Sequence, residues 1–271
     1  MMLFYVIISL EQRLKNCTNK FKNKITHTMI KTKSPWYWVP TLYFAQGIPY
    51  FIVNNISVMM FTKMGVPNGE MALFTSLLYL PWSFKPFWSP FVDIIKTKRW
   101  WTIGMQILMS VAFILLTLSI PTPSEEMIMN QSTPISMFTV TLLLFTMTAF
   151  ASATHDIAAD GFYMLALLQK EQAAFVGIRS TFYRLASIFG QGVLVAIAGA
   201  VELSSKDIPM SWRITMLVTA VLFSITTLYH TFFIPRPNTD RSVLGSEKVS
   251  ARTIFRDFGR TFATYFKKPG V

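Results

Sequence analysis

Residues 152–163, SATHDIAADGFY, place a histidine and two aspartates inside a long apolar segment of the chain. The surrounding segment, residues 135–168, exceeds the roughly 20 residues that a helix needs to cross about 30 Å of hydrocarbon. Charged side chains are costly at that depth, so they usually face one another or a water-filled cavity. We therefore expect a transmembrane helix that directs His155, Asp156 and Asp160 toward a polar interior.

The composition of the whole chain also indicates a membrane protein. Of its 271 residues, 52% are hydrophobic and only 14% are charged, which is too apolar for an ordinary soluble domain. The net charge of +12 would suggest nucleic acid as the partner of a soluble protein, but the basic residues cluster between apolar runs. Orientation in the bilayer explains that clustering better, so we expect the lipid bilayer and no nucleic acid as a partner.

Five further segments are long and apolar enough to cross a membrane: residues 36–61, 71–95, 100–120, 175–203 and 212–234. We predict an all-α integral membrane fold in which residues 36–234 form a bundle of six transmembrane helices. Most basic residues lie before the first span, between the second and third, or after the fourth and sixth. Only Lys63, Lys206 and Arg213 lie on the opposite side, so both termini are expected in the cytoplasm.

Both segments that flank the predicted bundle are basic. In residues 1–35, the apolar run at residues 1–10 is too short to span the bilayer. It is either an interfacial anchor or lies upstream of a true translation start near Met29. Residues 235–271 form a cytoplasmic linker in which apolar and basic residues occupy different faces of a helix, a pattern that suits the anionic cytoplasmic leaflet.

Further ionisable side chains fall in the cytoplasmic half of the predicted spans. They are Lys85 and Asp93 in the second span, Asp156 and Asp160 in the fourth, and Arg179 and Arg184 in the fifth. Because Asp156 and Asp160 are four residues apart, they share one helix face. We expect a proton-coupling charge network, although ion pairs that only hold helices together are an equal alternative for Asp93 and Arg179. His155 is either a hydrogen-bonded helix contact or a proton carrier.

Two of the predicted spans contain polar or proline-rich interruptions. In the first span, QGIPYFIVNNIS places Pro49 among the amides of Gln46, Asn54 and Asn55. Broken polar helices of this kind line substrate cavities in transporters, and we expect these three amides to do so. A proline kink with interhelical hydrogen bonds is the alternative. In the second span, LPWSFKPFWSP surrounds Lys85 with three prolines.

Sequence motifs for soluble chemistry are missing. The chain contains no GxxxxGK[ST], HExxH, CxxC or GxSxG. Its three histidines, His27, His155 and His230, lie far apart in sequence and on different predicted elements, and Cys17 is its single cysteine. We therefore expect neither an enzyme nor an ATP-driven pump, and neither a metal site nor a bound cofactor.

Three stretches carry a resemblance to a known family: GIPYFIVNNIS, YLPWSFKPFWSPFVDIIKTKRWW, and ATHDIAADGFYMLAL followed by GIRSTFYRLASIFGQG. With them the chain resembles the N-terminal half of a major facilitator superfamily transporter, and more narrowly the AmpG-like muropeptide permeases of the peptide-acetyl-coenzyme A transporter family. The resemblance implies proton-linked import of anhydromuropeptides, which are anionic glycopeptides, across the bacterial inner membrane for cell-wall recycling. It also implies that this chain is truncated before a second six-helix half, or that two copies assemble.

The resemblance further implies a gating loop between the second and third spans, made of Asp93, Lys96, Lys98 and Arg99. Two positions depart from the superfamily pattern. Ser89 stands in place of a glycine, and Ile94 follows Asp93 in place of a basic residue. These departures concern the details of the gate.

Other functions stay open at this point. Lys85, Arg179 and Arg184 suit any anionic substrate, so a carrier of acetyl-coenzyme A or another anionic solute is an alternative to a muropeptide permease. A membrane sensor that binds a ligand without transporting it is a second alternative. Sensing does not require protonatable groups at membrane depth, which favours a transporter.

Overall fold

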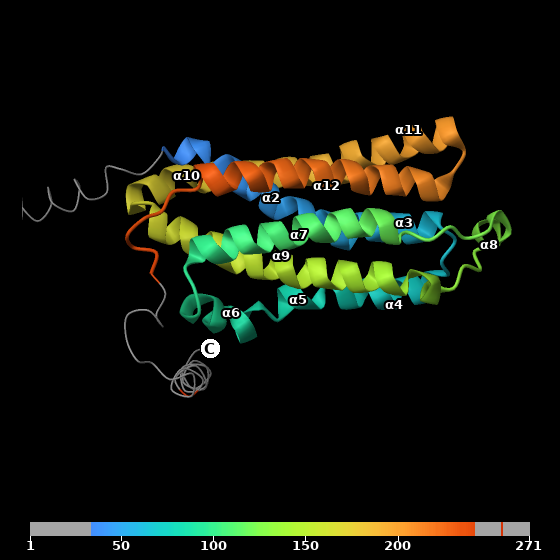
Figure 1. Cartoon of the computed structure of the whole chain (residues 1–271), viewed down its shortest axis with the longest axis horizontal. Coiled ribbons are helices and arrows are strands. Elements are labelled where there is room, and N and C mark those ends of the chain that lie inside the picture. The colour runs from blue at the N-terminus through green and yellow to red at the C-terminus, as the bar shows by residue number, and fades with distance from the viewer. Residues whose placement is uncertain (1–33, 242–255, 257–271) are drawn as a thin grey trace, which may run out of the picture.

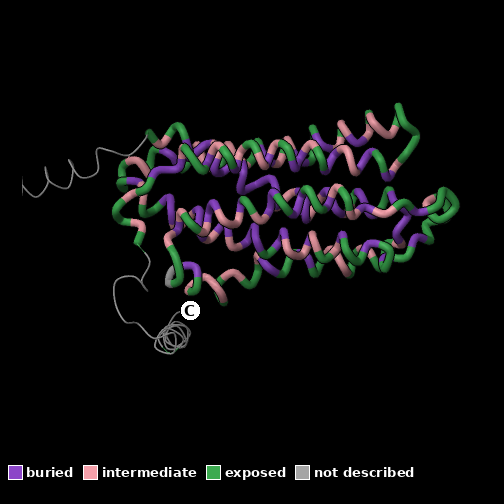
Figure 2. Tube along the Cα trace, viewed as in Figure 1, coloured by how far each residue is buried: buried purple, intermediate pink, exposed green. Residues whose placement is uncertain are grey.

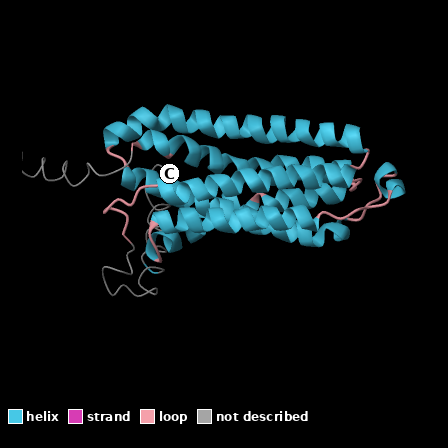
Figure 3. Ribbon diagram, turned by 45° about the horizontal axis from the view of Figure 1, so that its top comes forward, coloured by secondary structure: helices cyan, strands magenta, loops and turns pink. Residues whose placement is uncertain are grey.

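The computed structural model describes residues 34–241 and Arg256, apart from the side chains of Asp93 and Ile94. Over this part of the chain the structure is a bundle of helices without a strand, and the helices run along the long axis of the molecule (Figures 1 and 3). The predictions for residues 1–33 and for the amphipathic linker beyond Arg241 lie outside the described residues.

The described elements follow one another along the chain from the N-terminal to the C-terminal end. They are η1 (Pro35–Tyr37), α2 (Val39–Phe51), η2 (Ile52–Ile56), α3 (Ser57–Lys63), α4 (Asn68–Leu78), α5 (Leu80–Ser83), α6 (Lys85–Ile94), α7 (Lys98–Ser119), α8 (Glu125–Met129), η3 (Ile135–Phe138), α9 (Thr139–Ala166), α10 (Gln169–Ile188), η4 (Phe189–Leu194), α11 (Val195–Ser205) and α12 (Ile208–Phe233).

Four helical runs of the described chain are long and apolar enough to cross a membrane. They are Lys98–Ser119, Ile135–Ala166, Gln169–Ser205 and Ile208–Phe233. These runs coincide with the third to sixth predicted spans, and the all-α membrane prediction is confirmed for them. The run Gln169–Ser205 is continuous because the π-helical turn η4 joins α10 to α11.

The first two predicted spans are built from shorter helices. Residues 36–61 contain α2, the π-helical segment η2 and α3 without a break in the helical run, and Pro49 lies inside α2. Residues 71–95 divide into α4, α5 and α6, where Pro81 and Pro86 occupy the first turns of α5 and α6. Proline fits a first helical turn because the N–H that it lacks has no intrahelical partner there. A count of six transmembrane helices stays a prediction.

The described chain begins and ends at the same end of the bundle (Figure 1). The connection from α6 to α7 and the turn from α9 to α10 also lie at this end, whereas α3, α8 and the turn from α11 to α12 lie at the opposite end. The basic residues Lys96, Lys98 and Arg99 therefore share an end with the described termini. This arrangement agrees with the predicted sidedness, and the orientation in a membrane stays a prediction.

Apolar side chains both fill the bundle and cover its outside. Buried and exposed residues alternate along the long helices (Figure 2). Phe61, Phe113 and Phe145 are fully buried, while Leu118 and Leu143 on the outer faces of α7 and α9 are exposed. An exposed apolar surface of this kind suits contact with lipid.

Candidate functional site

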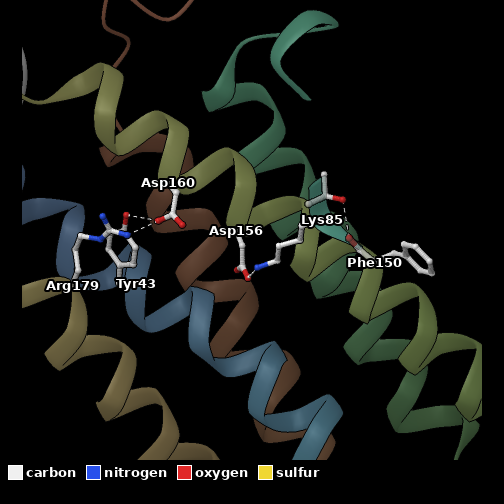
Figure 4. Close-up of polar contacts among 7 residues, drawn as sticks. Tyr43, Lys85, Phe150, Asp156, Asp160 and Arg179 are labelled. Atoms are coloured by element: carbon white, nitrogen blue, oxygen red, sulfur yellow. Dashed lines mark hydrogen bonds and ion pairs between the residues drawn. The ribbon is translucent and has the colours of Figure 1, made fainter. Parts of the chain in front are cut away.

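Lys85 and Asp156 form an ion pair between α6 and α9 (Figure 4). The Lys85 Nζ atom lies 2.6 Å from Asp156 Oδ2, and the Asp156 side chain is only 10% exposed. Lys85 is the first residue of α6, immediately after the break that separates α5 from α6. The prolines around Lys85 therefore start a new helix at the point where its side chain reaches α9.

A second charge pair lies one helical turn further along α9. Asp160 Oδ1 accepts a hydrogen bond from Arg179 Nη2 on α10 at 2.6 Å and another from the Tyr43 hydroxyl on α2 at 2.9 Å (Figure 4). The Arg179 guanidinium also lies over the rings of Tyr43 and Tyr163, with its Cζ atom 4.3 and 4.4 Å from the two centroids. Cation–π contacts and a charge-assisted hydrogen bond together hold this arginine in place.

A hollow of about 470 Å³ opens beside these pairs, between α2 and α10. It is lined by Tyr43, Gln46, Val176, Arg179, Ser180, Tyr183 and Arg184. Within the part of the chain that the structure describes, Arg184 is exposed and makes no ion pair, so Arg179 rather than Arg184 is the partner of Asp160. The hollow therefore combines two guanidinium groups with tyrosine hydroxyls, a wall suited to an anionic group.

The three amides predicted to line a substrate cavity are placed differently from one another. Gln46 lines the hollow. Asn54 donates a hydrogen bond from Nδ2 to the carbonyl oxygen of Tyr50 at 3.0 Å, one turn earlier in its own helix. Asn54 and Asn55 lie half-buried in η2 and do not contribute to this hollow. The role of these two amides in a substrate cavity stays a prediction.

His155 belongs to a buried polar chain that the sequence interpretation missed. Its Nε2 atom lies 3.0 Å from Gln106 Nε2, Gln106 Oε1 lies 3.0 Å from His230 Nδ1, and His230 Nε2 lies 3.0 Å from Thr41 Oγ1. The chain connects α9, α7, α12 and α2. Two histidines that are far apart in sequence thus contact one glutamine. The sequence held one indication of this contact, the single amide side chain of Gln106 within the apolar α7.

These contacts favour the interpretation of His155 as a hydrogen-bonded helix contact. Both imidazoles and the Gln106 amide are fully buried. Among the described residues, no group of three or more His, Cys, Asp or Glu side chains could hold a metal ion.

The predicted gating residues surround the beginning of α7. The backbone N–H groups of Lys98 and Arg99 donate to Asp240 Oδ1 and Oδ2 at 2.7 and 2.9 Å, and the Thr97 hydroxyl oxygen accepts from the N–H of Trp100. The Arg99 guanidinium donates to the carbonyl oxygens of Ile234 and Thr231 at the end of α12. Residues after α12 therefore cap α7, a contact that sequence reasoning did not predict.

The remaining side chains of the predicted gate are those of Lys98, Lys96 and Asp93. The Lys98 side chain crosses α9 at Gly161, where a Cβ atom would lie 2.9 Å from Lys98 Cε. Lys96 is exposed. The side chain of Asp93 lies outside the described residues, so its role in a gate stays a prediction.

Comparisons with known proteins identify relatives of the chain. Two Rickettsia proteins, from R. conorii and R. felis, are named as AmpG 4 transporters, and both names mark the assignment as provisional. They are 27% and 26% identical over 68% of this chain and 41% of their own length. An uncharacterised protein of Schizosaccharomyces pombe is 30% identical over 56% of this chain and 28% of its own length.

The chain spans less than half the length of these relatives, and no solved structure matches it. The sequence profile of the Major Facilitator Superfamily matches residues 41–269, which include every charge pair and hollow residue described above. On that match, the chain belongs to the Major Facilitator Superfamily.

Proposed function

We propose that this chain is the N-terminal, six-helix half of a proton-coupled secondary transporter that imports an anionic solute. Anhydromuropeptides are the first candidate solute, and the bacterial inner membrane is the proposed location, with both termini in the cytoplasm. The superfamily membership and the names of the two Rickettsia relatives support the transport function and the AmpG-like class. A proton is the proposed coupling ion, and no other cofactor is proposed.

One observation carries this proposal: two carboxylate–cation pairs lie next to a hollow whose wall contains two arginines. Asp156 pairs with Lys85, and Asp160 pairs with Arg179, which also lines the hollow. Charged groups at membrane depth are retained mainly where they serve an ion or substrate path. Protonation of a carboxylate weakens its attraction to the paired cation. The loss of this attraction can shift the equilibrium between two orientations of one helix bundle against another.

The solute path is completed by a second six-helix half, since superfamily transporters place the substrate between two such halves. Acetyl-coenzyme A and other anionic solutes fit the same arginines and remain candidates for the solute.

Uptake in proteoliposomes tests this function. The complete transporter should accumulate labelled anhydromuropeptide and take up protons with it, and replacement of the acidic partners, Asp156→Asn or Asp160→Asn, should reduce the coupled proton flux. Glu202→Gln is a matched control, because Glu202 pairs with Lys63 at the opposite end of the bundle. Unchanged proton coupling in both aspartate variants contradicts the proposal, and binding without uptake would identify a sensor instead. Competition by peptides and by coenzyme A thioesters then identifies the solute class.

A further inference from the structure

Three buried polar atoms on two helices near Asp156 lack a hydrogen-bond partner among the described residues. They are Asp156 Oδ1, Gln46 Oε1 and Ser152 Oγ. Ser152 lies one turn before Asp156 on the same face of α9, and the Gln46 side chain of α2 is within interaction range of the Asp156 carboxyl group. Buried polar groups are nearly always hydrogen-bonded, so a cluster of unbonded donors and acceptors marks a place where a change of protonation can create a hydrogen bond.

The two aspartates of α9 differ in how well their negative charge is satisfied. Asp160 receives hydrogen bonds from both Arg179 and Tyr43, and its side chain is 46% exposed. Asp156 receives one hydrogen bond, from Lys85 to Oδ2, and its side chain is 10% exposed. Hydrogen bonds and solvent stabilise a carboxylate, whereas burial without them destabilises it. Of the two, Asp156 therefore has more to gain from a proton.

In the described part of the chain, two unbonded polar groups lie near the second oxygen of Asp156, Ser152 on its own helix and Gln46 on α2, and of these Gln46 also lines the hollow. The charged and titratable groups that face the carboxyl are Lys85 from α6, Tyr50 from α2 and Tyr183 from α10, besides Asp160 on α9 itself. Within the described chain none of them bonds to Oδ1. A glutamine amide has both a donor and an acceptor, so Gln46 can donate to an ionised Oδ1 or accept from a protonated one.

Resting on the proposed function, we propose that Asp156 Oδ1 is the proton-binding atom of the transporter and that Gln46 is the residue that positions it. The proton adds to Oδ1, and the new O–H donates to Gln46 Oε1. Lys85 keeps its own proton but loses its counter-charge, so its ammonium becomes available to an anionic group of the solute. Proton and anion then favour each other's binding, which is the thermodynamic condition for their joint import.

Infrared difference spectroscopy of the reconstituted transporter tests the assignment without requiring transport. On acidification, the wild type should show the C=O stretching band of a buried carboxylic acid. The band should disappear in Asp156→Asn and persist in Asp160→Asn. It should shift in Gln46→Leu, which removes the acceptor, and return toward its original position in Gln46→Asn. A band that persists in Asp156→Asn overturns the assignment, and a band that does not move in Gln46→Leu overturns the role of Gln46.

Binding and flux separate this inference from the proposed function. Affinity for labelled anhydromuropeptide should rise as the pH falls in the wild type and in the control Glu202→Gln, and should lose its pH dependence in Asp156→Asn. Proton-coupled uptake that survives in Asp156→Asn but not in Asp160→Asn overturns this assignment and leaves the transport function intact. If the wild type itself carries no protons with the solute, the proposed function fails as well.

Discussion

At a pH where Asp156 is ionised, removal of the Lys85 ammonium should destabilise the bundle strongly, because it leaves the Asp156 carboxylate buried without a counter-charge. Breaking a buried ion pair from one side costs about 3–5 kcal/mol. The Lys85 side chain is 29% exposed and that of Asp156 is 10% exposed, so we expect Lys85→Met to cost about 3 kcal/mol, at the lower end of this range. For a chain of this size, each kcal/mol lowers the unfolding midpoint by about 2–4 °C.

The double variant Lys85→Met/Asp156→Asn shows whether the loss arises from the unpaired charge. With both charges removed, neither member of this pair remains as a buried ion, and stability should return to within about 1 kcal/mol of the wild type. The corresponding double-mutant cycle should therefore give an interaction energy of about 2 kcal/mol or more. The unfolding midpoint in mild detergent, followed by tryptophan fluorescence, measures each member of the cycle.

Lys63→Met is the matched control for Lys85→Met. Lys63 Nζ lies 2.9 Å from Glu202 Oε1, but the Lys63 side chain is 55% exposed, so removal of this pair should cost less than about 1 kcal/mol. If Lys85→Met lowers the unfolding midpoint no more than Lys63→Met does, the buried pair stabilises the bundle no more than the exposed pair does. A double variant that is no more stable than Lys85→Met alone refutes the argument from unpaired charge.

Three further substitutions test contacts that position the site. Asp240→Ala should cost about 1–2 kcal/mol of unfolding free energy, since it removes two hydrogen bonds that cap the start of α7. Hydrogen exchange at the start of α7 should become faster, and unchanged exchange there argues against the contact. Gln106→Leu should cost about 2–4 kcal/mol of unfolding free energy, because His155 Nε2 and His230 Nδ1 lose their shared partner while His230 Nε2 keeps Thr41. An unchanged unfolding midpoint argues against the buried chain. Gly47→Ala should cost about 1–3 kcal/mol of unfolding free energy, because the added Cβ atom would lie 2.6 Å from the Cβ atom of Ala186. Gly104→Ala is the control, since Gly104 has open space around it, and it should leave the unfolding midpoint unchanged or slightly raised.

Much of the fold could be predicted from local properties of the sequence. The length and hydropathy of the runs at residues 100–120, 135–168, 175–203 and 212–234 were sufficient, because a helix in hydrocarbon must satisfy its backbone hydrogen bonds internally over a fixed thickness. The prolines near Lys85 likewise predicted an interruption, which the structure places between α5 and α6. The same reasoning expected Pro49 to break its helix, but the helical run continues through η2.

The charge cluster could be predicted as a set of residues, since ionisable groups within apolar runs must find one another. The sequence by itself determined that Asp156 and Asp160 share a helix face and that cations lie at a similar depth. Only the tertiary structure decided that Lys85 pairs with Asp156 and that Arg179, rather than Arg184, pairs with Asp160. It also decided that Gln106 connects His155 to His230 through hydrogen bonds. Such pairings depend on the rotation and axial offset of one helix against another, and these are set by packing along the whole interface rather than by the periodicity of either helix.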